Sequence, residues 1–154
     1  MPRKLTSKSR RSTRNTGRVT FTSWVRSSGI TSTAKRLPAS DDPQWRGASK
    51  WRVTLRKGRK SMSLDYHMGS AHEGQPDTIG VLYSIVSDIG TFESSRPLKS
   101  KDELDHAESF SNELGYEGMK GLRVFRAVKK EAARFKKFVG PAEYERVLYL
   151  EMDY

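Results

Sequence analysis

The 154-residue chain has no cysteine, and no long run of apolar residues. The lack of cysteine excludes disulfides and cysteine-ligated metals and favours a reducing compartment, so we expect a cytoplasmic protein. No stretch approaches the roughly 18 apolar residues that span a bilayer, so we expect no membrane partner. Hydrophobic residues make up only 34% of the chain, which indicates that part of it contributes nothing to a core.

Acidic residues are absent from residues 1–40, which hold ten Lys and Arg and therefore nearly all of the net charge of +11. The first 18 residues have almost no large apolar side chains, so we expect them to be disordered. We interpret residues 1–44 as a basic tail and linker, and residues 45–154 as one small domain. Because dense positive charge favours polyanions, we predict that tail arginines contact phosphates: Arg10, Arg11, Arg14 and Arg18.

The segment Val19–Arg26 differs from the rest of the tail because it shows an alternation of Val19, Phe21 and Val25 with Thr20, Thr22 and Trp24. This period of two predicts a strand, either at a sheet edge or as a segment that orders on binding. Within it we expect Trp24 to stack on bases and Arg26 to contact phosphates.

The segment Trp51–Met68 shows two alternating runs separated by a short turn with Gly58, the pattern of a β-hairpin. One face of this hairpin is apolar and must be covered by helices. The turn carries Lys57, Arg59 and Lys60. Two interpretations of these bases remain open: contact with phosphates, or a solvated turn whose charge discourages edge pairing.

The longest helical pattern runs from Met119 to Val139 and has two faces. Apolar residues recur every three or four positions on one side, and Phe125 and Phe135 are expected to be core anchors. Gly140 and Pro141 end this helix, and a last short helix follows. The opposite side is basic, and we predict that it contacts nucleic acid through Arg123, Arg126, Lys130, Arg134 and Lys137.

Two further helices are expected between the hairpin and the long helix. The first begins at Asp77 or Thr78, ends at Gly90 and is central because it is apolar on more than one side. The second begins at a Ser100–Glu103 capping box. We predict that its acidic face contacts a protein: Asp102, Asp105, Glu108 and Glu113. The expected fold is α+β, an antiparallel hairpin of two or three strands packed against three to four helices, with a disordered basic tail.

Several short motifs between residues 51 and 146 resemble a family of small, functionally uncharacterised proteins of tailed bacteriophages and prophages. These motifs are the basic strand from Trp51 with Gly58 in its turn, Met68-Gly69-Ser70-Ala71, Pro76, Val81-Leu82, Ser87-Asp88, Leu114-Gly115-Tyr116 and Phe138-Val139-Gly140. The resemblance leaves out the tail. It implies a mobile-element origin and the cytoplasm of a bacterial host, and it brings no catalytic residues.

Candidate catalytic or metal-binding residues are few. Asp65, His67, His72, Glu73 and His106 fit no standard ligand spacing, so we interpret them as solvated polar residues. No phosphate-binding glycine loop occurs. We therefore expect no metal, no cofactor and no enzymatic activity.

The expected function is binding of nucleic acid, RNA or DNA, or of a nucleoprotein complex. A small basic phage protein of this kind could inhibit host defence in the manner of anti-CRISPR proteins. The alternative is a structural component of a large RNA–protein or virion assembly, because basic tails can thread between phosphates. The sequence leaves the oligomeric state open.

Overall fold

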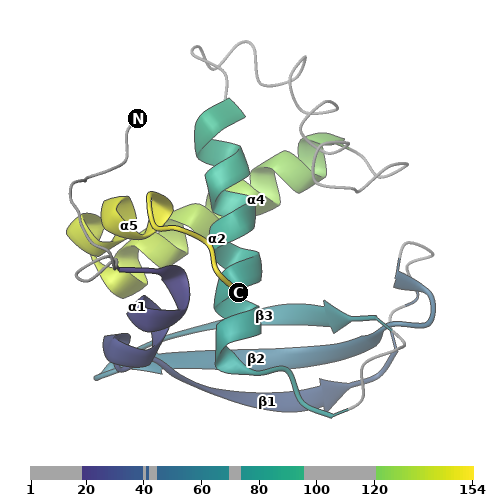
Figure 1. Cartoon of the computed structure of the whole chain (residues 1–154). Coiled ribbons are helices and arrows are strands. Elements are labelled where there is room, and N and C mark those ends of the chain that lie inside the picture. The colour runs from purple at the N-terminus through teal and green to yellow at the C-terminus, as the bar shows by residue number, and fades with distance from the viewer. Residues whose placement is uncertain (1–18, 40, 42–44, 70–73, 96–120) are drawn as a thin grey trace.

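The computed structural model describes residues 19–39, 41, 45–69, 74–95 and 121–154 (Figure 1). It confirms the α+β class, with helices on one side of a three-stranded antiparallel sheet of order β1-β2-β3. The elements are α1 (Phe21–Ser28), β1 (Thr31–Leu37), β2 (Ser49–Lys57), β3 (Lys60–Met68), α2 (Thr78–Ser95), α4 (Gly121–Val139) and α5 (Pro141–Leu148). None of these described helices combines the length and the apolar composition needed to cross a membrane.

The predicted hairpin is confirmed. Strands β2 and β3 pair in register up to Lys57 opposite Lys60, and Gly58 takes a φ of 61° in the turn, a value that favours glycine. The apolar side chains of both strands lie on the face toward the helices, which we call the inner face. Its buried members are Trp51, Val53, Leu55 and Met62.

The helices close the core above this inner face. The apolar side of α4 is buried as predicted, with Phe125 1% and Phe135 0% exposed. Helix α2 contacts α1, α4 and α5, which confirms its central place. The hydroxyl of Tyr144 on α5 donates to Glu93 Oε2 on α2 at 2.6 Å and ties these two helices together.

The predicted strand over Val19–Arg26 is wrong, because the chain forms helix α1 there. Thr20 and Ser23 make a capping box, and Gly29 ends the helix in the left-handed conformation with a φ of 79°. Phe21, Trp24 and Val25 then fall on one buried side, as positions three and four apart do on a helix.

The third strand of the sheet is instead β1, whose residues were predicted to belong to the tail. It pairs with β2 along its whole length, from Thr31 opposite Arg56 to Leu37 opposite Lys50. The folded unit therefore includes residues 21–37, and the boundary expected at residue 45 is corrected. Segments of low apolar content fold here because they pack on a core that the later elements supply.

Helix α2 also extends beyond its expected end at Gly90 and continues to Ser95. Ile89 and Phe92, on either side of the glycine, are both buried. Their burial outweighs the penalty of about 1 kcal/mol for glycine within a helix. The expected start is confirmed, since the backbone N–H of Gly80 donates to Asp77 Oδ1 at 2.6 Å.

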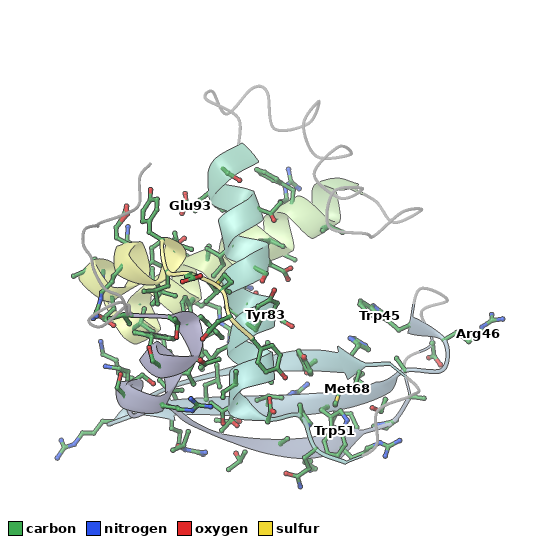
Figure 2. The ribbon with its side chains drawn as sticks, in the orientation of Figure 1. Trp45, Arg46, Trp51, Met68, Tyr83 and Glu93 are labelled. Atoms are coloured by element: carbon green, nitrogen blue, oxygen red, sulfur yellow. The ribbon has the colours of Figure 1, made fainter. Side chains whose placement is uncertain are left out.

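The C-terminal segment crosses α1 and α2 and joins the two ends of the described chain. The backbone N–H of Phe21 donates to the Glu151 carbonyl at 2.8 Å, and the Thr22 hydroxyl donates to Asp153 Oδ2 at 2.6 Å. This bond from the Thr22 hydroxyl and a second from its backbone N–H lower the pKa of Asp153 to about 2. Figure 2 shows Tyr83 beside this segment, where its ring lies 5.3 Å from that of Tyr154.

Candidate nucleic-acid interface

Helix α4 presents its basic side next to strand β3. Arg126, Lys130 and Lys137 are exposed on the side opposite the apolar one, as predicted. Arg123 lies in the first turn of α4, but its side chain is outside the described part of the structure. The tail arginines Arg10, Arg11, Arg14 and Arg18 and the acidic residues Asp102, Asp105, Glu108 and Glu113 also lie outside the described residues.

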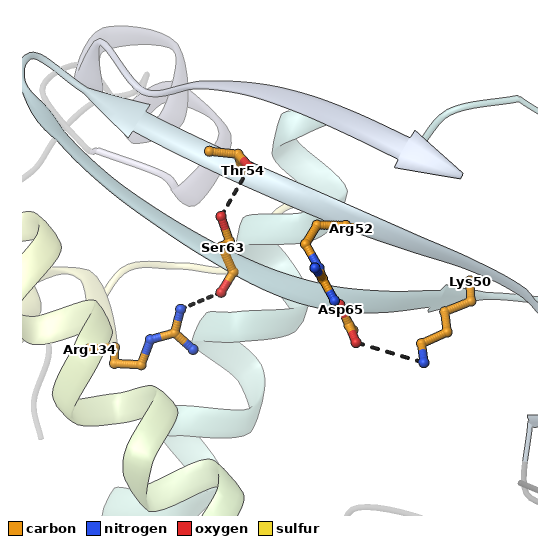
Figure 3. Close-up of polar contacts among 6 residues, drawn as sticks. All are labelled: Lys50, Arg52, Thr54, Ser63, Asp65 and Arg134. Carbon is orange, nitrogen blue, oxygen red and sulfur yellow. Dashed lines mark hydrogen bonds and ion pairs between the residues drawn. The ribbon is translucent and has the colours of Figure 1, made fainter. Parts of the chain in front are cut away.

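Arg134 connects α4 to the sheet (Figure 3). Its Nη2 donates to the backbone carbonyl of Ser63 on β3. Strand β3 is an edge of the sheet, so this bond pairs a carbonyl on a strand edge. Arg134 therefore has a structural role that the helical pattern did not reveal, in addition to its predicted place on the basic side.

The basic hairpin turn meets the C-terminal end of α4. The Lys60 Nζ donates to the Lys137 carbonyl at 3.3 Å, and a cation is favoured near the carbonyls that end a helix. A hydrogen bond from Trp24 lowers the pKa of Glu143 on α5, with smaller contributions from Arg146 and then from the charge of Lys57. The structure thus brings one predicted basic residue of the turn, Lys60, to the end of the long helix.

The face of the sheet opposite the inner one, which we call the outer face, carries further bases. Register places Lys35 opposite Arg52, and Arg52 opposite Asp65. Arg52 Nε lies 2.8 Å from Asp65 Oδ1, and Lys50 Nζ lies 3.8 Å from Asp65 Oδ2 (Figure 3). The hydrogen bond from Arg52 lowers the pKa of Asp65. Sequence reasoning did not select the bases of this face: Lys35, Lys50, Arg52 and Arg56.

A groove of about 480 Å³ lies between α4 and the outer face beside β3; we call it the α4–β3 groove. Its charged and polar lining comes from β2, β3 and α4: Arg52, Ser63, Asp65, Lys130, Glu131 and Arg134. Lys130 and Arg134, which were predicted to bind nucleic acid, therefore line the same groove as Arg52, which was not.

Two carboxylates between α2 and α4 modify the charge of this groove. Burial and, to a lesser extent, the charge of Asp88 raise the pKa of Glu131 to about 7, with Arg134 acting against the shift. Burial alone raises the pKa of Asp88 to about 6. Near neutral pH Glu131 is therefore partly protonated and cancels less of the positive charge of the groove.

Trp24 does not lie where base stacking requires. Its side chain is 2% exposed, and its indole Nε1 donates to Glu143 Oε2 at 2.6 Å. The prediction that Trp24 stacks on bases is therefore wrong, because a ring covered on its faces by the core cannot receive a base. Arg26 is exposed in the last turn of α1, a helix that packs on α2.

Replacing Trp24 by Phe is expected to lower the free energy of unfolding by about 1.5–3 kcal/mol, the usual contribution of a hydrogen bond to a charged group. Phe keeps a buried aromatic ring but lacks the five-membered ring of indole, so the smaller volume adds to the loss. Glu143 loses the Trp24 donor and keeps the bond from Arg146. Urea unfolding measures the change. A variant as stable as the parent would contradict the role assigned to this bond.

The described residues contain no group of three or more His, Asp or Glu that could hold a metal ion. The ring of His67 stacks on Trp45 with 4.3 Å between centroids, and Asp65 is engaged by Arg52 and Lys50. His72, Glu73 and His106 lie outside the described part of the chain.

No protein-family model, curated protein or solved structure matches the chain. The resemblance of residues 51–146 to proteins of tailed bacteriophages therefore stays a prediction.

Proposed function

We propose that this protein binds nucleic acid, and that the α4–β3 groove and the outer face of the sheet form the folded part of its binding surface. The observation that carries the proposal is the convergence of bases from separate segments on one surface. Arg52 of β2 and Lys130 and Arg134 of α4 line one groove, although they lie far apart in sequence. Phosphates are the ligands that such a surface favours.

The arrangement of the bases within the sheet supports an anionic partner. On the outer face Lys35 lies directly opposite Arg52. Like charges opposite each other destabilise a sheet, and a bound polyanion would offset that repulsion. Protection of the sheet edge can account for Lys35 on strand β1, but not for Lys130 on a helix.

The role proposed is binding rather than catalysis. In the groove Asp65 is engaged by Arg52 and Lys50 and serves to position these two basic side chains, while burial raises the pKa of Glu131. In the setting that the phage resemblance suggests, such a protein would act on nucleic acid within a host nucleoprotein complex. A pull-down from a bacterial host, with and without nuclease, tests that setting.

Affinity is expected to fall steeply with salt. If about six phosphates are neutralised, the logarithm of affinity should fall against the logarithm of salt concentration with a slope of roughly −5 on duplex DNA, or about −4 on single strands. Reversing Lys130 to Glu should weaken binding about tenfold or more and flatten the slope. Fluorescence anisotropy titrations at several salt concentrations measure both effects.

Lys129→Glu is the matched control, because Lys129 is exposed on the same helix but does not line the groove. It changes the net charge by the same amount and should weaken binding far less. Deleting residues 1–18 should flatten the slope further while leaving residues 21–37 in the fold. An affinity independent of salt, or equal losses for Lys129→Glu and Lys130→Glu, would show that the groove is not the binding surface.

A further inference from the structure

The geometry points to duplex DNA as the nucleic acid that this surface takes, with the outer face of the sheet set into the major groove. This inference rests on the proposed function and narrows its partner. The first observation is the distribution of side chains across the sheet. Basic side chains lie along both edges of the outer face: Lys35 on β1, and Lys130 and Arg134 on α4 beside β3.

Between these edges runs a row of small hydroxyl side chains. Register places Thr33 opposite Thr54 and Thr54 opposite Ser63. The Thr54 and Ser63 hydroxyl oxygens lie 3.0 Å apart, so this part of the face is low and polar (Figure 3). A duplex presents a matching pattern, with phosphates along both rims of its major groove and the polar edges of bases between them.

The dimensions of the sheet agree with this placement. Neighbouring strands lie about 4.8 Å apart, so β1 and β3 are roughly 10 Å apart across the outer face. The major groove of B-DNA is about 12 Å wide and admits a two-stranded β-ribbon, so two neighbouring strands of this sheet fit within its width. The major groove of A-form RNA is deep and narrow, and side chains do not reach its base edges.

Two arginines of the central strand are placed to meet base edges. Arg52 and Arg56 are both exposed on β2. Arg52 is held by Asp65 at 2.8 Å, and Arg56 Nη1 donates to the Thr33 hydroxyl at 3.3 Å. Neighbours of this kind orient a guanidinium, and arginine is the side chain that most often contacts guanine in the major groove.

Single strands are bound chiefly by aromatic rings on which bases stack. Two of the tryptophans, Trp24 and Trp51, are buried. Trp45 and His67 stack on each other at 4.3 Å, so one side of each ring is already covered. Among the described residues of the three strands, the outer face presents hydroxyl groups and basic side chains. A single strand would need exposed aromatic rings on which its nucleobases could stack.

The test compares a duplex DNA of about 20 base pairs, two helical turns, with each of its separated strands and with a duplex RNA of the same sequence. Anisotropy titrations of the full chain should give at least about tenfold tighter binding to duplex DNA than to either strand or to the RNA. The salt concentration is the same in all titrations because affinities are comparable only at one salt concentration.

A matched pair of variants on β1 tests the face. Lys35 is on the outer face, whereas its neighbour Arg36 is on the inner face, with its guanidinium 5.5 Å from the centre of the Trp51 ring. Lys35→Gln should weaken duplex DNA binding about fivefold and flatten the salt slope by about one unit, the effect of one lost phosphate contact. Arg36→Gln removes the same charge and should leave affinity nearly unchanged. Circular dichroism checks that both variants are folded.

The possible failures separate the two proposals. Separated strands or duplex RNA bound as tightly as duplex DNA would overturn the inference while leaving nucleic-acid binding in place. Equal losses for Lys35→Gln and Arg36→Gln would overturn the placement of the outer face. Absence of binding to all of these nucleic acids would overturn the proposed function and the inference with it.

Discussion

Replacing Phe135 by Ala is expected to lower the free energy of unfolding by about 3–5 kcal/mol, the usual loss for a buried phenylalanine. The side chain is 0% exposed and its ring lies 6.4 Å from that of Tyr144, so truncation leaves a cavity between α4 and α5. Because small domains have only about 5–15 kcal/mol of stability, this single change should remove a large part of it. Thermal and urea unfolding measure the loss.

Tyr149→Ala is the matched control, because Tyr149 is also aromatic but 65% exposed. It should change the free energy of unfolding by no more than about 0.5 kcal/mol. If Phe135→Ala unfolds like this control, the apolar side of α4 does not face the core as the structure shows.

The hairpin and α4 could be predicted because the apolar residues of each recur with a single period, two in the strands and about 3.6 in the helix. The alternation from Trp51 to Leu55 and from Met62 to Met68 allows only a strand, and Gly58 supplies the turn. In α4 the apolar spacing persists over five turns of helix. Long, regular patterns of this kind determine local structure and burial together.

Helix α1 was missed because its eight residues satisfy both periods. Phe21 and Val25 are four apart, which is an even number and fits a strand as well as a helix. Thr20, Ser23 and Gly29 decide between them through the cap and the helix end, and these three residues were present in the sequence. Strand β1 was missed for a different reason. Its inner-face positions Ser32, Ala34 and Arg36 give no apolar alternation, and it becomes a strand by pairing with β2.

The candidate site could be predicted only in part. The basic side of α4 follows from helical spacing, but its partner Arg52 does not, because the groove depends on how α4 lies on β3. The bond from Arg134 to Ser63 joins residues 71 positions apart. The proximity of Asp88 to Glu131 likewise depends on how α2 packs on α4, and this packing cannot be predicted from local sequence patterns.

These two carboxylates lead to the second large effect, a loss of stability as pH rises. The pKa of Asp88 is raised from 3.8 to about 6, and that of Glu131 from 4.5 to about 7. The folded state therefore holds protons that the unfolded state has already released. Stability is greatest below about pH 4 with respect to these groups, and it falls as pH rises from about 4.5 to about 7.

Glu131→Gln and Asp88→Asn should each stabilise the protein at pH 8, because an amide has no charge to bury. Each pKa unit corresponds to about 1.4 kcal/mol, so the pair should contribute a change on the order of a few kcal/mol between pH 4.5 and pH 8. Arg134 offsets part of this change for Glu131. Carboxylates with a lowered pKa, such as Asp65 and Asp153, act in the opposite direction but at lower pH.

Urea unfolding at pH 5, 6, 7 and 8 measures the change in the parent chain and in both variants. Glu145→Gln provides the control, since Glu145 is an exposed acid on α5. The parent should lose stability across this range, and each variant should lose less. Two results would contradict this: a parent that gains stability from pH 5 to pH 8, or variants that are less stable than the parent at pH 8. Either would mean that Asp88 and Glu131 are charged in the folded protein and are each stabilised by positively charged groups. The α4–β3 groove would then carry the full negative charge of Glu131 at neutral pH, and Lys130 and Arg134 would be left with less net charge for a phosphate.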